Sequence, residues 1–417
     1  GHLNEDYFGG DLKGIQMKLP YLHKMGVDFI YLNPIFEAHS NHRYNTADYL
    51  NVDPLLGTNE DFEALCTAAK KYGIGIVLDG VFSHTGSDSR YFNREGRYGE
   101  GGAYRDPNSP YRCWYDFGPQ YKGGYRSWWG FETLPEVNEE TPSYVEFITG
   151  PGGVIDTWLR RGAAGFRLDV ADELPDEFIE KVRAAVKRVS PEKFLLGEVW
   201  EDATTKFGFN KRRTYLLGKG LDSVMNYPFK NAVLDFVKGK PAEQAMTEIL
   251  TICEHYPAPA MDTALNFLST HDTERALTVI ADEPANGRGR AWQSGRCVTG
   301  DAYEEGLLRL RMAYAIIYTL PGVPCLYYGD EIAMQGYRDP FNRAFFRWDA
   351  HEQRLRPVLA QLAQLRHTCE AFRTGQLRVL RAEDGILHYQ RVGKVETAEI
   401  IVNRTEHIIV ETLASGK

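Results

Sequence analysis

The feature that most constrains the fold is a regular alternation of short apolar segments with amphipathic helical patterns. Strands that alternate with helices along a chain form a parallel sheet, and this many units indicates a closed (β/α) barrel. We therefore predict the α/β class and a (β/α)8 TIM barrel. The predicted strands lie near residues 28–33, 75–79, 165–169, 194–198, 221–226, 264–270 and 323–328, and the predicted helices lie at 11–25, 59–72, 151–161, 175–189, 229–237, 242–254 and 303–319.

The pattern supplies seven strands, whereas the predicted barrel has eight. The first ten residues have the composition of a loop, so we expect the first barrel strand to lie upstream of this sequence. An open barrel would leave unpaired backbone groups at its edges. Since the C-terminal segment also looks cut short, we expect a chain that is truncated at both ends.

Two segments depart from the alternation and predict the domain organisation. The stretch of about 85–145 is too long for one crossover and is rich in Gly, Tyr, Arg and Trp. Long insertions in compact domains are usually functional, so we predict an inserted subdomain after the third strand, over the catalytic end of the barrel. After a helix near 352–368 the pattern becomes one of alternating strands. The predicted domains are therefore a barrel at 1–372 and a partial C-terminal all-β domain at 373–417.

Composition excludes several classes of partner. The net charge of -9 argues against nucleic acid and anionic membrane surfaces. No apolar run approaches the roughly 20 residues of a membrane-spanning helix. The six cysteines have neither metal-binding nor redox spacing, so we predict reduced thiols and favour the cytoplasm. Secretion stays open, because the sequence does not begin with Met and a signal peptide could have been removed.

Acidic side chains follow three of the predicted strands at the point where each strand ends. Asp169 ends the segment Gly165–Asp169, Glu198 comes 29 residues later, and Asp272 follows another apolar run. Because parallel strands point the same way, we expect all three acids at one end of the barrel. A single acid in such a place usually caps a helix, but three of them together favour a catalytic site. Two carboxyl groups that face one bond across a gap can break a glycosidic linkage.

The segments around these acids resemble the α-amylase family, glycoside hydrolase family 13. Within that family the chain most resembles the group of neopullulanases, cyclomaltodextrinases and maltogenic amylases. The four family motifs occur in order at sensible spacing, which makes the resemblance specific. They are Asp79–His84, Gly165–Ala171, Gly197–Trp200 and Phe267–Asp272, and the group-level features are Asn41–Tyr49 and the Asn138 that ends Leu134–Asn138.

The resemblance implies a role for each acid. Asp169 would be the nucleophile, and Arg167, two residues earlier on the same strand face, would keep it ionised. Glu198 would protonate the leaving oxygen and then act as the base that activates water, and burial or the charge of Asp169 would help it to hold its proton. Asp272 would bind sugar hydroxyls and favour the distorted ring. A retaining mechanism places the carboxyl groups of Asp169 and Glu198 roughly 5–5.5 Å apart.

The resemblance also implies the residues that bind substrate. His84 and His271 would bond hydroxyls of the sugar being cleaved, and Tyr44 would stack on its face. Trp200 is a candidate platform on the leaving-group side. The full predicted set is Tyr44, His84, Arg167, Trp200, His271, Asp339 and Arg343, where the last two would bind the next sugar on the non-reducing side, and Asp79 would be a structural support that bridges Arg167 or Tyr44.

The metal and partner predictions are weaker. Family calcium sites use loop carboxylates and carbonyls, and Gly9 with Asp11 could form half of one. We expect no required cofactor and leave Ca²⁺ as an option. The expected partner is an α-glucan oligosaccharide, without nucleic acid or membrane, and a homodimer is an option for the full-length protein.

The resemblance implies that the protein is an enzyme, a retaining glycosidase that works through a covalent glycosyl-enzyme intermediate. It would cleave α-1,4 bonds, with α-1,6 bonds as a further option, in maltooligosaccharides, cyclodextrins or pullulan. The alternatives are an α-glucosidase or a 4-α-glucanotransferase on the same fold, and a non-enzymatic carbohydrate-binding homologue, which the presence of Asp169 and Glu198 disfavours. Glu201 and Leu134–Asn138 depart from the group's pattern, so linkage and acceptor preference stay open.

Overall fold

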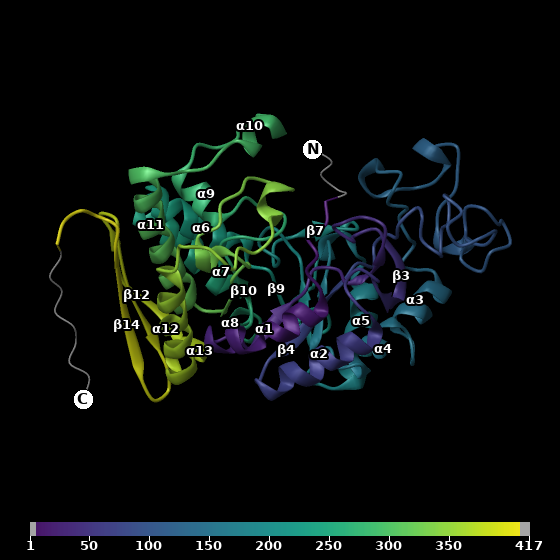
Figure 1. The fold of residues 1–417 in the computed structure, drawn as a ribbon. Helices are drawn as coiled ribbons and strands as arrows, with labels where there is room; N and C mark the ends of the chain where they lie inside the picture. The colour runs from purple at the N-terminus through teal and green to yellow at the C-terminus, as the bar shows by residue number, and fades with distance from the viewer. Residues whose placement is uncertain (1–5, 409–417) are drawn as a thin grey trace. The chain divides into compact units, whose positions relative to one another are not determined.

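The computed structural model describes residues 6–408, which form two compact units (Figure 1). Within the described residues, the first unit consists of 6–199 and 203–224, and the second consists of 200–202 and 225–408. Each unit has its own parallel strands and its own surrounding helices, and each is described separately below.

The first unit is built on a five-stranded parallel sheet. Its strands are apolar and largely buried, as is usual when helices cover a parallel sheet. Gly165 allows the two central strands to approach closely, because a Cβ at this position would lie 2.1 Å from the carbonyl oxygen of Phe194. In sheet order the strands are β1 (Phe29–Tyr31), β4 (Gly75–Gly80), β5 (Gly165–Leu168), β6 (Phe194–Gly197) and β9 (Ser223–Val224).

The helices of this unit follow directly from local sequence signals. The helix α2 begins at a capping box, in which Thr58 accepts from the backbone of Asp61 and Asp61 accepts from the backbone of Thr58. The helix α5 buries an apolar stripe at i, i+3 and i+4 spacing, which includes Phe178, Ile179 and Val182. The helices are α1 (Leu12–Lys24), α2 (Asn59–Lys71), α3 (Pro142–Thr149), α4 (Val154–Arg160) and α5 (Asp176–Val189).

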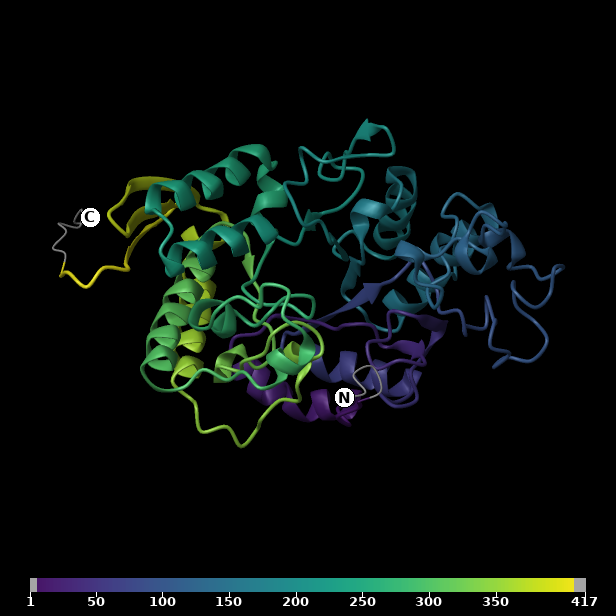
Figure 2. The same cartoon turned by 90° about the horizontal axis from the view of Figure 1, so that it is seen from above.

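The predicted insertion is mostly irregular. Figure 2 shows it in blue as loops with short turns, between β4 and α3 in the chain. Aromatic rings take the place of a regular core, and Phe92 contacts both Tyr115 and Tyr125 at centroid distances of 4.8 and 4.6 Å. The short 3-10 helices are η1 (Arg112–Trp114), η2 (Lys122–Gly124) and η3 (Trp128–Gly130).

Several elements of the first unit, the helix α3 among them, were not expected from the sequence. Two antiparallel pairs lie outside the central sheet, and a single 3-10 turn follows β5. They are β2 (Phe36–Ala38) with β3 (Thr46–Val52), the hairpin β7 (Phe207–Gly208) with β8 (Lys211–Arg212), and η4 (Ala171–Glu173). The two-residue strands β7 and β8 and the three-residue turn leave no usable periodicity in the sequence.

The second unit combines one parallel strand pair with a group of helices and a C-terminal antiparallel sheet. Figure 1 shows that sheet in yellow, next to the helix α12 of the same unit. The parallel pair is β10 (Leu265–Asn266) with β11 (Val323–Pro324), and the sheet runs in the order β12 (Gln376–Glu383), β13 (Ile386–Val392), β14 (Thr397–Asn403). The helices are α6 (Tyr227–Lys238), α7 (Ala242–His255), α8 (Ala258–Asp262), α9 (Ala276–Ala281), α10 (Arg290–Ser294), α11 (Gly300–Thr319), α12 (Leu355–Thr368) and α13 (Ala371–Thr374), with η5 (Asp330–Ile332) and η6 (Phe341–Arg343) as 3-10 turns.

The predicted fold class is confirmed. Each of the seven predicted strands overlaps a strand of the structure, and within each unit these strands pair in parallel. The antiparallel C-terminal sheet is also as predicted. An upstream eighth strand and the domain boundary near 372 stay predictions, and residues 1–5 and 409–417 lie outside the described part. In the described part, no helix combines the length and the apolar composition that a membrane crossing requires.

Candidate active site

The guanidinium of Arg167 lies at the centre of the candidate site and is fully buried. It sits in β5, so register places it beside Asp79 of β4, while Asp169 and Glu198 directly follow β5 and β6. Its Nη1 donates to Asp79 Oδ1 at 2.9 Å and to Asp169 Oδ1 at 2.8 Å, and its Nη2 lies 2.9 Å from Glu198 Oε2. The predicted pairing of Arg167 with Asp169 is therefore present, and the same cation also contacts the other two acids.

The charges of this cluster depend on one another because all four side chains are buried. Burial disfavours the charged form of Arg167, but the carboxylates of Asp79 and Glu198 hold the pKa of its guanidinium above the ordinary value. Buried charges are tolerated only where they are paired and hydrogen-bonded. Three acids around one cation thus form a single electrostatic unit.

Asp79 is bonded from two sides. Besides Arg167, the hydroxyls of Tyr31 and Tyr44 each donate to Asp79 Oδ2 at 2.8 Å. Burial raises the pKa of both tyrosines well above the ordinary value, which keeps them neutral donors. These contacts agree with the bridging position expected for Asp79, and its supporting role in the reaction stays a prediction.

The backbone after the nucleophile candidate contributes a group that the sequence analysis missed. Val170 adopts the left-handed conformation, with φ 42° and ψ 48°. Its N–H donates to Glu198 Oε2 at 2.8 Å. No side-chain pattern signals a backbone donor of this kind, so only the structure could find it.

His84 is held as a neutral ring. It is buried, with Nδ1 2.9 Å from Ser83 Oγ and Nε2 3.0 Å from the carbonyl oxygen of Tyr44. Burial lowers the pKa of His84 to about 4. The ring also contacts Trp128 of the insertion at a centroid distance of 5.4 Å. Its predicted contact with a sugar hydroxyl stays a prediction.

Two tryptophans of the insertion hold one carboxylate of the loop that follows β5. Trp128 Nε1 donates to Glu173 Oε2 at 2.6 Å, and Trp129 Nε1 donates to Glu173 Oε1 at 2.9 Å. The sequence analysis did not single out Glu173. A Trp-Trp pair shows that indole donors are present, but not which acceptor they reach.

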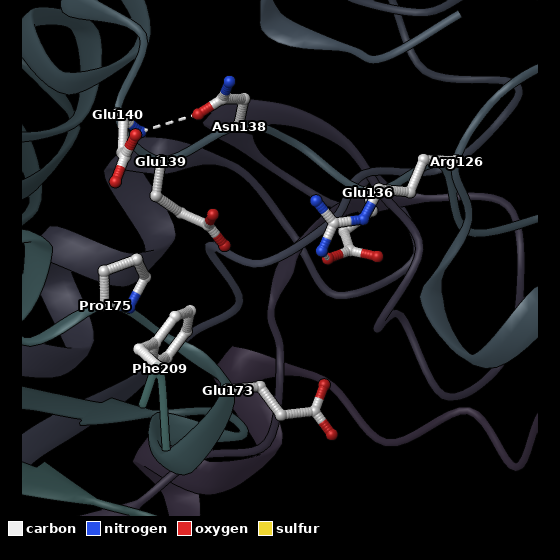
Figure 3. Close-up of a pocket in the computed structure, with 8 residues that line it drawn as sticks. All are labelled: Arg126, Glu136, Asn138, Glu139, Glu140, Glu173, Pro175 and Phe209. Atoms are coloured by element: carbon white, nitrogen blue, oxygen red, sulfur yellow. Dashed lines mark hydrogen bonds and ion pairs between the residues drawn. The ribbon is translucent and has the colours of Figure 1, made fainter. Parts of the chain in front are cut away.

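An acidic pocket of about 470 Å³ adjoins this contact (Figure 3). Arg126 pairs with Glu136 at 2.5 Å, and the carboxyl group of Glu139 points into the open space between the lining residues. Burial, with a further contribution from the charge of Glu136, raises the pKa of Glu139 to about 8. The lining residues are Arg126, Glu136, Asn138, Glu139, Glu140, Glu173, Pro175 and Phe209.

Four of the remaining predicted residues, all in the second unit, form one chain of contacts. His271 Nε2 lies 2.9 Å from Asp272 Oδ2, and Arg343 Nη2 lies 3.6 Å from Asp272 Oδ1. Arg343 Nε lies 2.9 Å from Asp339 Oδ1 and donates to the carbonyl oxygen of His271 at 3.1 Å. Trp200 stacks on Tyr227 at a centroid distance of 4.0 Å and is 42% exposed.

The predicted site residues thus fall into two groups. The first unit contains Asp79, Arg167, Asp169 and Glu198 together with Tyr44 and His84, and the second contains Trp200, His271, Asp272, Asp339 and Arg343. The gathering of all three acids at one end of a barrel and the carboxyl separation of roughly 5–5.5 Å stay predictions.

The metal candidates have a different local role. Asp11 is the N-cap of α1, and its Oδ1 accepts the N–H of Gly14 at 2.6 Å. Over residues 6–408 no group of three or more His, Cys, Asp or Glu side chains is arranged to hold a metal ion. Calcium binding at Gly9 and Asp11 stays an untested option.

Comparison with known proteins places the chain in a family. Residues 3–372 match the family described as alpha amylase, catalytic domain. Amylopullulanase from Thermoanaerobacter thermohydrosulfuricus is 37% identical, over 94% of this chain and 28% of that protein. Neopullulanase 2 from Thermoactinomyces vulgaris is 32% identical, over 99% of this chain and 66% of that protein. A solved structure, cyclic alpha-maltosyl-(1-->6)-maltose hydrolase from Arthrobacter globiformis, has a TM-score of 0.83 at 29% identity, over 97% of this chain and 84% of that one.

The chain therefore belongs to the α-amylase family of glycoside hydrolases, as its motifs predicted. The likeness to neopullulanases and cyclomaltodextrinases is also confirmed, and a cyclomaltodextrinase is among the similar structures, with a TM-score of 0.80. The chain spans 28% of the length of the amylopullulanase named above.

Proposed function

We propose that this chain is the catalytic region of a retaining glycosidase that cleaves α-1,4-glucosidic bonds. The observation that carries the proposal is the pair formed by Asp169 and Glu198, which follow adjacent parallel strands and share the guanidinium of Arg167. A retaining glycosidase needs one carboxylate that attacks and one carboxyl group that donates and then accepts a proton.

Each acid has a distinct part in the proposed reaction. Asp169 attacks the anomeric carbon, and the charge of Arg167 at 2.8 Å favours the ionised form that attack requires. Glu198 protonates the leaving oxygen and then removes a proton from the water that releases the sugar. Both Arg167 and the N–H of Val170 contact Glu198 Oε2, which fixes that carboxyl group in orientation.

The second unit supplies the proposed sugar contacts. Asp272 and His271 would bind hydroxyls of the sugar being cleaved, and Arg343 orders both of them through its contacts. Because bond cleavage is complete with two carboxyl groups, we propose that no cofactor takes part in it. Calcium binding is left as a structural option.

We propose short or cyclic α-glucans as the substrate class, with α-1,6 bonds as a further option. The names of similar proteins support this choice, since they include a cyclomaltodextrinase, a neopullulanase and a hydrolase of a cyclic maltosyl-maltose. The Asp339–Arg343 pair adds polar, charge-bearing contacts of the type that hold a defined sugar.

Two measurements test the proposal: the anomeric configuration of the first product, and the loss of activity when either acid is replaced. ¹H NMR of the purified protein with maltotriose, a cyclodextrin and pullulan should show the α-anomer as the first product. Asp169→Asn and Glu198→Gln should each reduce kcat by about 10³-fold or more, as removal of members of a catalytic unit does. Glu180→Gln, an exposed position in α5, is the matched control and should keep full activity. A β-anomer as the first product, or activity retained in Asp169→Asn, would overturn the proposal.

A further inference from the structure

The loop that follows the proposed nucleophile holds an unfavourable backbone conformation. Val170 has φ 42° and ψ 48°, and a β-branched residue in the left-handed region is a genuine outlier. Such a conformation costs free energy and persists only where the surrounding structure over-determines it. In this conformation the N–H of Val170 donates to Glu198 Oε2 at 2.8 Å. Val170 therefore both holds the strained backbone conformation and donates the hydrogen bond to the proposed acid.

The beginning of this loop is fixed by the sheet. The N–H of Asp169 donates to the carbonyl oxygen of Gly80 at 3.1 Å, and that of Glu198 donates to Leu168 at 3.0 Å. These bonds continue the parallel ladders of β4, β5 and β6 beyond the assigned strands. They hold the two acids, but they do not prevent Val170 from rotating.

The end of the loop is fixed by the insertion. Val170 is followed by the turn η4, in which the N–H of Glu173 donates to the carbonyl oxygen of Val170 at 2.8 Å. The carboxylate of Glu173 accepts from Trp128 at 2.6 Å and from Trp129 at 2.9 Å. Hydrogen bonds to an ionised acceptor are stronger than bonds between neutral groups. We call Trp128, Trp129 and Glu173 the indole latch.

The insertion side of the latch is itself anchored. The N–H of Trp128 donates to the carbonyl oxygen of Leu134 at 2.9 Å, and its ring contacts the buried His84 at 5.4 Å. Trp129 is also left-handed, with φ 49°, and remains 77% exposed although its indole N–H is bonded. Residues on both sides of the contact, Val170 and Trp129, therefore hold left-handed backbone conformations.

We propose that Trp128 and Trp129 are positioning residues for the reaction. By holding Glu173 through the indole latch, they keep Val170 left-handed and its N–H directed at Glu198. This inference rests on the proposed function and deepens it, because it gives the insertion a defined task at the acid/base residue.

Release of the latch has a specific electrostatic consequence. Val170 relaxes to a negative φ, and Glu198 loses a donor that favours its ionised form. The basic limb of the pH–rate profile, where the acid loses its proton, then moves to higher pH. The other charged or titratable groups at this position in the first unit stay unchanged in the variants: Arg167 and Asp169 from β5 and its end, Asp79 from β4, and Tyr31 from β1.

The test is the double variant Trp128→Phe/Trp129→Phe, which keeps two aromatic rings and removes both N–H donors. Relative to the wild type, we expect kcat to fall about tenfold or more and KM to change less than about threefold. The basic limb of the pH–rate profile should move up by about one pH unit. These changes correspond to the loss of one hydrogen bond to a charged group. Trp114→Phe is the matched control, since its Nε1 donates to Ser143 Oγ of α3 at 3.0 Å and does not reach the latch. It should leave kcat and the basic limb unchanged.

A second variant separates positioning from folding. Glycine adopts the left-handed conformation without penalty, so Val170→Gly should make the latch less necessary. In the Val170→Gly background, removal of both indole donors should lower kcat much less than in the wild type. A crystal structure of the double Phe variant should show residue 170 at negative φ.

The outcomes distinguish the inference from the function on which it rests. The inference is overturned if the double Phe variant keeps the basic limb of the wild type, or if Trp114→Phe loses as much kcat as the double Phe variant. Inactive Asp169→Asn and Glu198→Gln variants would in that case keep the proposed function standing. If those two acid variants stay active, both proposals fail.

Discussion

Arg167 in β5 is paired at 2.9 Å with Glu198, which directly follows the neighbouring strand β6. In the parallel register Arg167 lies opposite Leu196 and Leu168 lies opposite Gly197, so Asp169 and Glu198 emerge side by side just beyond the arginine. The same guanidinium also reaches Asp79 and Asp169. The geometry of both proposed catalytic carboxyl groups therefore depends on one buried cation.

The first prediction concerns that cation. Arg167→Ala should lower the free energy of unfolding by roughly 3–5 kcal/mol, because it leaves buried carboxylates without their partner. Arg167→Lys keeps a charge but loses the planar fork, so it should recover part of the stability while activity stays low. Urea unfolding and kcat/KM measure the two effects. A stable Arg167→Ala protein would contradict the account of the charge cluster.

The second prediction concerns the two tyrosine donors to Asp79. Tyr31→Phe and Tyr44→Phe each remove one hydrogen bond to Asp79 Oδ2, and each should cost about 1–3 kcal/mol of stability. The double variant should cost less than the sum, since both bonds end on one oxygen. Tyr44→Phe keeps the aromatic face, so KM should stay within about threefold. A large rise in KM with unchanged kcat would instead assign the hydroxyl to substrate binding.

The third prediction concerns pH. Burial raises the pKa of Glu139 from its ordinary value to about 8, so the folded protein keeps a proton that the unfolded chain loses near pH 4.5. The unfolded state therefore binds fewer protons between these values, and this residue makes stability fall as pH rises from about 5 to 8. Glu139→Gln should flatten that dependence, whereas Glu100→Gln, at an exposed position of the insertion, should not. Equal pH profiles of unfolding for the wild type and Glu139→Gln would show that this carboxyl group does not hold its proton in the folded protein.

The fourth prediction concerns the second unit. Asp272→Asn should reduce kcat/KM by about 10³-fold or more, because its proposed contacts strengthen as the ring distorts. Asp339→Asn should mainly raise KM, since that residue lies at the far end of the Arg343 contacts. Steady-state kinetics on maltotriose separate the two. A kcat for Asp272→Asn near that of the wild type would remove this residue from the catalytic group.

The fifth prediction concerns substrate choice. Short and cyclic α-glucans should be better substrates than amylose by kcat/KM, and the full-length protein is the appropriate sample. A kcat/KM for amylose well above that for cyclodextrin would correct the substrate class and leave the family assignment unchanged.

The sequence was a good guide wherever a strand or a side-chain motif carried the information. The apolar run at 165–168 and the acid that follows it predicted both β5 and the pairing of Arg167 with Asp169. Strand alternation likewise predicted β6 and the position of Glu198 at its end. These features are local in the sequence, and the parallel register of β5 and β6 then places the two acids at neighbouring strand ends.

What the sequence could not predict depends on loop backbone and on partners distant in the chain. The left-handed Val170 gives no side-chain signal, because valine is not a residue that favours that region. The bonds from Trp128 and Trp129 to Glu173 span more than 40 residues, and an indole does not specify its acceptor. The hairpin β7–β8 has only two residues in each strand, too few for any periodic pattern.

The most direct test of the central claim, that Asp169 attacks and Glu198 acts as acid and base, is azide rescue of the two alanine variants on an activated α-maltosyl substrate. In Glu198→Ala, azide should capture the covalent intermediate on Asp169 and give the α-glycosyl azide, with retained configuration. In Asp169→Ala, azide should replace the nucleophile and give the β-glycosyl azide. These opposite anomers are expected if Asp169 is the nucleophile and Glu198 is the acid and base. The same anomer from both variants, or an α-azide from Asp169→Ala, would contradict that assignment.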